Sequence, residues 1–250
     1  IWLITRENQG FVVDPGESGP VLAALEARGI ELAGILVTHH HFDHTGGVPP
    51  GQFRGMIFGP FGGGADARVP GLHEMAADGA AAHAHAAEVA RVAAQCQLAE
   101  GEIVPLTQGQ LLPIGAHVIE VLHTPGHASN HLCYLLLEQG LLFSGDHVMQ
   151  GSTVVINPPD GDMKAYLDSL YDLLAEPLRT LAPAHGFLMA QPESVIDFLI
   201  SHRLSREHKI ARALAALSPA PLEAVTAQAY DDVPAAIHGL AARSALSCAL

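Results

Sequence analysis

Four potential metal ligands occur within six residues of the chain: His39, His41, Asp43 and His44. Neutral imidazole is the commonest metal ligand in proteins at neutral pH, and a carboxylate adds negative charge. In a tightly turned loop His39 and His41 can converge on one point, while Asp43 and His44 turn toward a second point nearby. The stretch therefore supplies ligands for two cations but leaves each site incomplete.

Three further residues of suitable type follow later predicted strands, where functional groups are often presented. His127 ends the segment Leu-His-Thr-Pro-Gly-His, Asp146 lies in Phe-Ser-Gly-Asp-His, and His185 ends Ala-Pro-Ala-His. Each has a Gly or Pro nearby that permits a sharp turn. Because a carboxylate has two oxygens, Asp146 suits a position shared by both cations.

The ordered motifs HxHxDH, TPGH, SGD and AHG resemble those of the metallo-β-lactamase superfamily, over roughly residues 1–190. The resemblance implies an α/β fold, an αβ/βα four-layer sandwich in which two mixed sheets are covered by helices and the metals lie at one edge. It also implies two metal sites with a shared ligand: His39, His41 and His127 for the first metal, Asp43, His44 and His185 for the second, and Asp146 as the bridge.

Such a centre implies a hydrolytic reaction. Two cations about 3.5–4 Å apart can share a water and lower its pKa toward about 7. A hydroxide held by the two cations would attack a carbonyl carbon or phosphorus, and a cation would stabilise the developing oxyanion. Asp43 is the candidate catalytic residue, because it can bind metal and also orient the nucleophile or relay its proton. A ligand set of His and Asp favours two zinc ions, with iron or manganese as alternatives.

The periodicity of apolar residues predicts the elements that position these ligands. A hairpin is predicted over 1–14, and a buried strand over 33–38 leads directly into the His cluster. Further strands are predicted at 55–58, 103–106, 117–122, 132–137, 141–144 and 178–183, with a loop over 59–71. Helices are predicted at 19–29, 74–96, 163–174, 192–216, 222–229 and 234–247. This alternation indicates an α/β protein.

The tail narrows the resemblance. Residues 1–190 are predicted to form the catalytic domain, and residues 191–250 a small helical domain. The segments TPGHASNH, SGDHVM and PPDGDM are similar to those of the lactamase-beta-two, endoribonuclease-like group, in which a winged-helix-like domain follows the catalytic domain. The chain stops at Leu250 before a wing hairpin, so this second domain would be incomplete.

The resemblance leaves the substrate open, because one metal centre serves thioesters, lactones, lactams and phosphodiesters on this fold. Thioester hydrolysis of the glyoxalase II type competes closely with the nuclease hypothesis. A mononuclear iron dioxygenase of the persulfide dioxygenase type is the alternative from another class, and it would leave some of the seven ligands unused. A non-catalytic winged-helix DNA-binding protein would leave all seven unexplained.

The net charge of the chain indicates which class of partner it can bind. The net charge of −14 repels a polyphosphate backbone, so a small-molecule substrate is expected, with single-stranded RNA as the alternative. Basic residues at helical spacing recur over 203–212: Arg203, Arg206, Lys209 and Arg212. A solvated helix face is the expected explanation, and contact with nucleic acid the alternative.

The cysteine count and the lack of a long apolar run indicate where in the cell the protein is expected. Three cysteines without paired spacing favour a reducing, cytoplasmic location, and no apolar run is long enough for a membrane span. The chain begins at Ile1 inside a strand-like run, so a targeting segment could precede it. A homodimer is one option for its oligomeric state.

His40 is expected to point away from the ligands. His131 and His147 lie close to ligands in the sequence, and hydrogen bonds to those ligands are an option for both. The expected place of His83 and His85 is an exposed Ala-rich helix.

Overall fold

A computed structural model describes residues 1–45, 81–86, 89–96, 103–114, 117–217 and 219–249. The chain divides into two units, residues 1–121 and 122–250, and each is described by itself. The strand predicted at 55–58 and the loop at 59–71 lie outside the described residues. Within the described residues no helix is long and apolar enough to cross a membrane.

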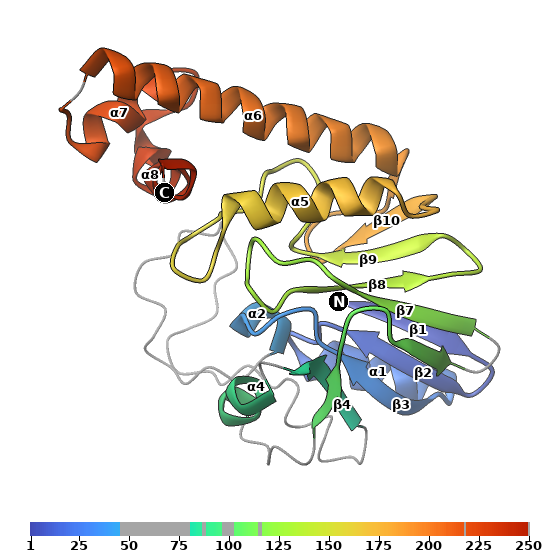
Figure 1. The fold of residues 1–250 in the computed structure, drawn as a ribbon. Coiled ribbons are helices and arrows are strands. Elements are labelled where there is room, and N and C mark those ends of the chain that lie inside the picture. The colour runs from blue at the N-terminus through green and yellow to red at the C-terminus, as the bar shows by residue number, and fades with distance from the viewer. Residues whose placement is uncertain (46–80, 87–88, 97–102, 115–116, 218, 250) are drawn as a thin grey trace. The chain divides into compact units, whose positions relative to one another are not determined.

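The first unit is built on a five-stranded sheet in the order β1-β2-β3-β4-β5 (Figure 1). The hairpin predicted over 1–14 is confirmed, since β1 (Trp2–Arg6) and β2 (Gln9–Val13) pair antiparallel. Parallel pairing continues from β2 through β3 (Glu31–Leu36), β4 (Ala81–His85) and β5 (Ile103–Leu106). Parallel strands bring their carboxyl ends to one edge, so side chains that follow β2 and β3 lie close together.

Helix α1 (Ser18–Arg28) confirms the predicted crossover between β2 and β3. Its Val21 and Leu25 are buried in a cluster with Val12 and Ile35 of the sheet. Each such buried side chain stabilises the unit by about 1.5–3 kcal/mol. The helix ends at Gly29, whose left-handed φ of 61° lets its N–H bond to the carbonyls of Leu25 and Glu26.

The prediction of one or two helices over 74–96 is wrong for residues 81–85, which form β4. Residues 89–96 are helical as predicted and form α4 (Val89–Cys96), and residues 74–80 lie outside the described residues. An Ala-rich run favours a helix by local propensity, but pairing with β3 and β5 overrides it. Ala82 and Ala84 are fully buried in this sheet, so His83 and His85 are half-buried strand residues rather than exposed helix residues.

Besides β4, two short strands were not predicted. The strand β6 (Leu111–Ile114) pairs antiparallel with β7 (His117–His123), and its Pro113 weakens a strand pattern. The other is β11 (Met189–Ala190), which is too short to show periodicity. Strands β6 to β11 belong to a second sheet, and the boundary between the two units falls inside its strand β7.

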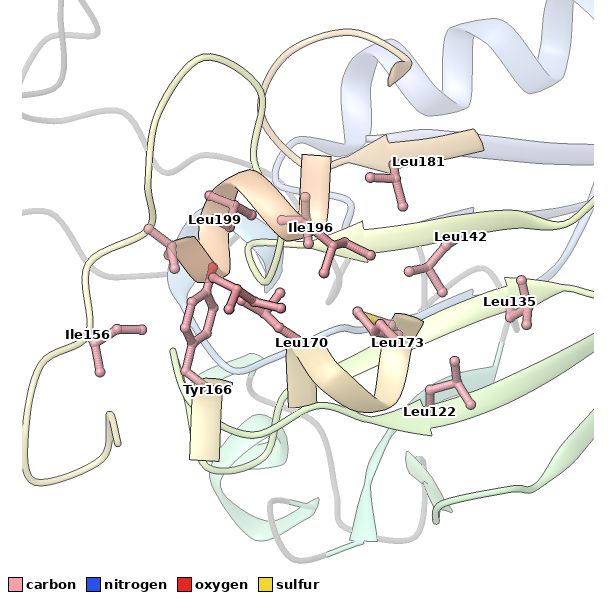
Figure 2. Packing of buried hydrophobic residues seen from close by; sticks show 14 of the residues in the cluster. Leu122, Leu135, Leu142, Ile156, Tyr166, Leu170, Leu173, Leu181, Ile196 and Leu199 are labelled. Carbon is pink, nitrogen blue, oxygen red and sulfur yellow. The ribbon is translucent and has the colours of Figure 1, made fainter. Parts of the chain in front are cut away.

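In the second unit, β8 (Leu132–Leu136) pairs antiparallel with β9 (Leu141–Gly145), and β10 (Thr180–Pro183) pairs parallel with β9. Helix α5 (Met163–Leu174) is the crossover between β9 and β10, capped by the Asp162 side chain on Ala165 N–H. Its buried face packs with strand and α6 residues in one cluster, shown in Figure 2, that includes Leu135, Leu142, Tyr166, Leu170, Ile196 and Leu199. This core fixes the strand ends that bear Asp146 and His185.

The C-terminal part of the second unit is helical, as predicted: α6 (Pro192–Leu217), α7 (Leu222–Ala229), the short 3₁₀ helix η3 (Ala235–Ile237) and α8 (His238–Ala249). Ile210, Val225, Tyr230 and Ala245 form a small core of their own there. The predicted domain division, 1–190 and 191–250, and the winged-helix character of the tail stay predictions.

The expectation of a solvated basic face on α6 is wrong for two of its four residues. Arg203 and Arg206 are only 5% and 8% exposed. Arg203 donates to the Val154 carbonyl and lies over the Tyr166 ring. Arg206 pairs with Asp232 and lies over Tyr230. The helical spacing correctly placed these arginines on one face of α6, but that face packs against other residues and is buried.

Candidate metal centre

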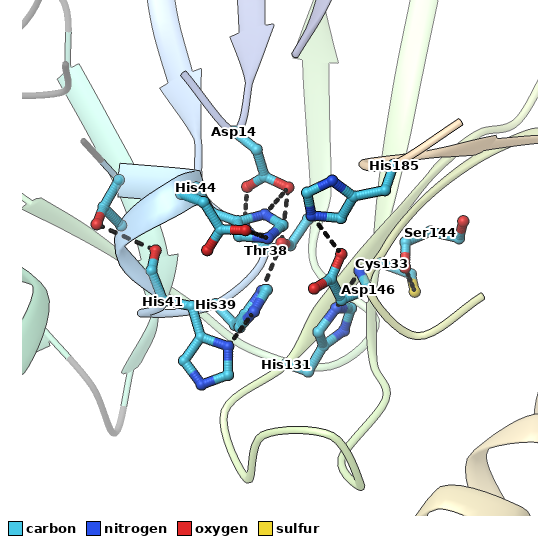
Figure 3. Close-up of polar contacts among 12 residues, drawn as sticks. Asp14, Thr38, His39, His41, His44, His131, Cys133, Ser144, Asp146 and His185 are labelled. Atoms are coloured by element: carbon cyan, nitrogen blue, oxygen red, sulfur yellow. Dashed lines mark hydrogen bonds and ion pairs between the residues drawn. The ribbon is translucent and has the colours of Figure 1, made fainter. Parts of the chain in front are cut away.

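The carboxyl-end edge of the first sheet presents a buried carboxylate that sequence reasoning missed. Asp14 directly follows β2 and is 3% exposed. Its two oxygens accept hydrogen bonds from Thr38 N–H and Thr38 Oγ1, both at 2.8 Å, and from His44 Nδ1 at 2.9 Å (Figure 3). The signal available in the sequence was an Asp at a strand end, the same signal that identified the other candidates. Asp14 therefore joins β2 to the His cluster that follows β3.

Thr38 determines which nitrogen of His39 can bind a metal. The single hydroxyl proton of Thr38 is donated to Asp14, so Thr38 Oγ1 accepts from His39 Nδ1 at 3.0 Å. The proton of His39 thus lies on Nδ1, and Nε2 holds the lone pair. That Nε2 lies 2.9 Å from Nδ1 of His41. The two imidazoles therefore direct nitrogen atoms at one point, as the HxH spacing predicted.

Asp43 and His44 form the second pair of the first unit, in the short helix α2 (Phe42–Thr45). His44 Nδ1 is bonded to the Asp14 carboxylate, so its proton lies there and Nε2 holds the lone pair. His44 Nε2 lies 3.6 Å from a carboxylate oxygen of Asp43. His40 instead turns to Arg91, whose Nη1 lies 3.1 Å from His40 Nε2, in keeping with the expectation that it is not a ligand.

In the second unit Asp146 lies between two imidazoles. One of its oxygens is 3.7 Å from His127 Nε2, and the other is 3.4 Å from His185 Nε2. His127 Nδ1 donates to the Val155 carbonyl at 2.7 Å, so the proton of His127 also lies on Nδ1 and Nε2 holds the lone pair. His127 thus presents a metal-binding nitrogen on the side facing Asp146.

The carboxylate–imidazole distances fit metal ligands better than direct hydrogen bonds, whereas the 2.9 Å between His39 Nε2 and His41 Nδ1 is a hydrogen-bond distance. The three carboxylate–imidazole separations of 3.4 to 3.7 Å exceed the usual hydrogen-bond length of about 2.7–3.2 Å. Two ligand atoms that share a tetrahedral zinc at about 2.0–2.2 Å stand about 3.3 Å apart. The donor set is nitrogen and carboxylate oxygen, which zinc, iron and manganese accept. The chemistry of these residues therefore fits metal ions, and the full assignment of seven ligands to two ions stays a prediction.

His131 and His147 flank the ligands in different ways. The ring nitrogens of His131 accept from Asp146 N–H at 3.2 Å and bond Thr124 Oγ1 at 2.9 Å, so His131 holds the backbone of Asp146. His147 is fully buried against the Tyr166 ring, with centroids 4.8 Å apart. Among the described residues neither of its ring nitrogens has a hydrogen-bond partner.

The environment of His147 predicts how stability depends on pH. Burial, with a smaller contribution from His127, lowers the pKa of His147 to about 3. Between pH 6.5 and 3, His147 becomes protonated in the unfolded chain but stays neutral in the folded chain. The free energy of unfolding therefore falls as pH falls, by at most about 1.4 kcal/mol per pH unit. Urea unfolding of metal-free protein at several pH values should show a shallower acid loss for His147→Leu than for the wild type. Equal slopes in both proteins would contradict this assignment.

A single glycine sets the turn before His127. Gly126 has a φ of 144°, and a Cβ there would lie 2.4 Å from the Cα of Tyr166. Only glycine tolerates both the backbone conformation and the approach to α5. Gly126→Ala is expected to destabilise the chain by about 2 kcal/mol or more and to displace His127. Thermal unfolding compared with Gly109→Ala measures this, because Gly109 also has a positive φ but open space where a Cβ would lie. Equal losses for the two variants would contradict the role of crowding.

The chain matches the family model described as the metallo-beta-lactamase superfamily over residues 1–55 and 69–185. A metallo-beta-lactamase family protein from Thermus thermophilus shares its fold, with a TM-score of 0.70 at 19% identity, covering 98% of this chain and 85% of that one. The structure of TTHA1623 in a di-iron-bound form is 27% identical with a TM-score of 0.52, covering 76% and 88%. The predicted α/β metallo-β-lactamase fold is confirmed.

The curated relatives are longer proteins. A hydroxyacylglutathione hydrolase from Dechloromonas aromatica is 33% identical over 179 residues, which are 71% of this chain and 55% of that protein. The lactamase-like protein notP of Aspergillus is 28% identical over 209 residues, 82% of this chain and 54% of that protein. The chain thus spans about half the length of these relatives, and the endoribonuclease-like subgroup stays a prediction. The family model, which covers well over half of the residues, shows that the chain belongs to the metallo-β-lactamase superfamily.

Proposed function

We propose that the chain is the catalytic part of a binuclear, zinc-dependent hydrolase that cleaves an ester-like bond, with an acyl thioester as the first candidate. Asp146 is the observation on which the proposal rests. Its two carboxylate oxygens face two different imidazoles, those of His127 and His185. A carboxylate flanked in this way can bind one cation through each oxygen, which is the arrangement of a two-metal site.

The proposal joins ligands from both units. His39, His41 and His127 would hold one ion, Asp43, His44 and His185 the other, and Asp146 both. When bound, the two cations supply a Lewis acid for the scissile carbonyl and lower the pKa of water toward about 7. These residues are presented with their ligand atoms oriented, since Thr38, Asp14 and the Val155 carbonyl each fix the proton of one imidazole on Nδ1.

Asp43 has a second role in the proposal. Its side chain is 37% exposed, unlike the buried Asp14 and the nearly buried Asp146. A carboxylate at this edge can accept a hydrogen bond from the attacking water, orient it and receive its proton. Asp43 is therefore proposed as both ligand and general base.

The proposed substrate class is argued from the names of the relatives and from the burial of two arginines on α6. Relatives named hydroxyacylglutathione hydrolase, from Dechloromonas aromatica and Nitrosomonas eutropha, favour an acyl substrate over a phosphodiester. A bound RNA would need free cations, whereas Arg203 and Arg206 are buried. Because the similar protein TTHA1623 has a structure in a di-iron-bound form, iron is the alternative metal to zinc in this proposal.

Metal content per chain is the measurement that tests the proposal. Elemental analysis of protein purified without added metal should find about two zinc ions, and hydrolysis of an acyl-glutathione thioester should stop after chelation and return with zinc. Lactones, lactams and RNA are the parallel substrates. About one iron per chain would favour the oxygenase alternative, and a chain that binds no metal after reconstitution would contradict the proposal.

A further inference from the structure

The second unit contains a cavity of about 200 Å³ between residues 152–155, helix α6 and the segment from Tyr230 to Ser244. This volume exceeds the roughly 30 Å³ of one water but is below the roughly 300 Å³ of pockets for drug-sized ligands. None of the seven predicted metal ligands lines it. The cavity therefore has the size for a small molecule, and its lining touches the proposed ligands through Val155, whose carbonyl accepts from His127 Nδ1.

Two arginines line this cavity, and only one of them is neutralised. Arg206 binds the carboxylate of Asp232 through both terminal nitrogens, at 2.8 and 3.2 Å, so its charge is compensated. Arg203 is only 5% exposed, and its contacts are neutral groups: the Val154 carbonyl, the Tyr166 hydroxyl and the Tyr166 ring. In the described part of the chain no carboxylate pairs with Arg203, and its Nε has no hydrogen-bond partner.

A buried guanidinium without a counter-charge is costly, because it has lost its water and gained no anion. It stays charged at any physiological pH. The neighbouring His202 adds a second unmet group, since its buried Nδ1 also has no hydrogen-bond partner among the described residues. Burial and the two arginines lower the pKa of His202, so its ring adds no charge at neutral pH. The cavity thus offers one net positive charge.

One positive charge matches a monoanion, whereas a phosphate dianion would need further cations. The rest of the wall is largely apolar, with Val154, Val155, Val233, Ile237 and Ala241. A hydrocarbon chain of a few carbons would be buried against these side chains, at about 0.8 kcal/mol per buried CH₂.

We propose that this cavity binds a small organic monocarboxylate with a short aliphatic chain. The carboxylate pairs with the charge of the Arg203 guanidinium, and the chain packs against Val233, Ile237 and Ala241. This site is independent of the proposed hydrolysis, because it needs no metal and no turnover.

Stability measurements with sodium butyrate test the site. Thermal unfolding of the whole chain is followed as butyrate increases, against sodium chloride at equal ionic strength. A ligand that binds only the folded state raises Tm as its concentration passes Kd. The expected result is a rise specific to butyrate in the wild type, with an apparent Kd at least about tenfold weaker in Arg203→Met, which loses the positive charge.

Two further variants test the cavity without removing Arg203. Ala241→Leu fills the cavity while leaving the guanidinium in place, and it should also weaken butyrate binding at least about tenfold even if Arg203→Met does not fold. Arg212→Met removes an exposed arginine of the same helix and should bind butyrate like the wild type. No butyrate-specific rise in the wild type, or the same rise in Ala241→Leu, would overturn the proposal. A larger effect of inorganic phosphate at equal ionic strength would overturn the carboxylate assignment.

Discussion

Replacing Asp146 by alanine is expected to abolish hydrolysis and to release at least one metal ion per chain. Asp146 is the only predicted ligand shared by both ions, and its two carboxylate oxygens face His127 and His185. Its removal takes an oxygen from each ion, so turnover should fall by about 10³-fold or more. Elemental analysis and a thioester assay on the same preparation measure both effects.

Asp168→Ala is the matched control for this prediction. Asp168 is a 58% exposed carboxylate of the same unit, on α5, and it pairs with Lys164 at the surface. Surface pairs of this kind contribute little, so the control should keep its metal, its activity and its unfolding midpoint. An Asp146→Ala protein with full turnover and both metal ions would show that the ligand assignment is wrong.

Replacing Asp14 by alanine is expected to damage both the fold of the first unit and its metal binding. Three donors lose their acceptor at once: Thr38 N–H, the Thr38 hydroxyl and His44 Nδ1. Each buried group left unsatisfied costs about 1–3 kcal/mol, so stability should fall by about 3 kcal/mol or more. His44 also loses the partner that orients its ring, which typically weakens metal affinity about 10–100-fold.

Two variants separate the roles of Asp14. Asp14→Asn keeps the shape and tolerates the φ of 50°, but it removes the charge, so it should fold better than Asp14→Ala and still bind metal more weakly. Glu17→Ala removes an exposed carboxylate nearby that makes no capping hydrogen bond, and it should change neither property. Urea unfolding of metal-free protein and metal titration measure the two roles. If Asp14→Ala matched Glu17→Ala in both, Asp14 would have no part in the site.

Some elements could be predicted from the sequence because their signals are local. The hairpin of β1 and β2 follows from two apolar runs about a short turn, and α1 from a 3.6-residue period that stops at Gly29. The candidate ligands could be chosen for a related reason. A polar residue that follows a buried strand within a few positions lies near a sheet edge, whichever strands pair with it, and His39, Asp146 and His185 all meet that condition.

Other features depend on partners that the local sequence does not contain. Residues 81–85 have the composition of a helix, and only pairing with β3 and β5 makes them a strand. Asp14 was passed over as the end of a hairpin, because its importance comes from Thr38 and His44, which lie 24 and 30 residues further along the chain. The nitrogens with which His39, His44 and His127 are proposed to bind metal likewise depend on hydrogen-bond partners outside the motifs.

By itself, the sequence determined the α/β class, most helices and strands, and the types and order of the candidate ligands. These follow from short-range periodicity and from strand ends, which need no knowledge of packing. Only the tertiary structure decided which charges are internal. The spacing of Arg203 and Arg206 shows that they share a face of α6, but whether that face meets water depends on the residues that pack against it, Tyr166 and Tyr230. Those contacts buried both guanidinium groups and left Arg203 without a carboxylate partner in the described part of the chain.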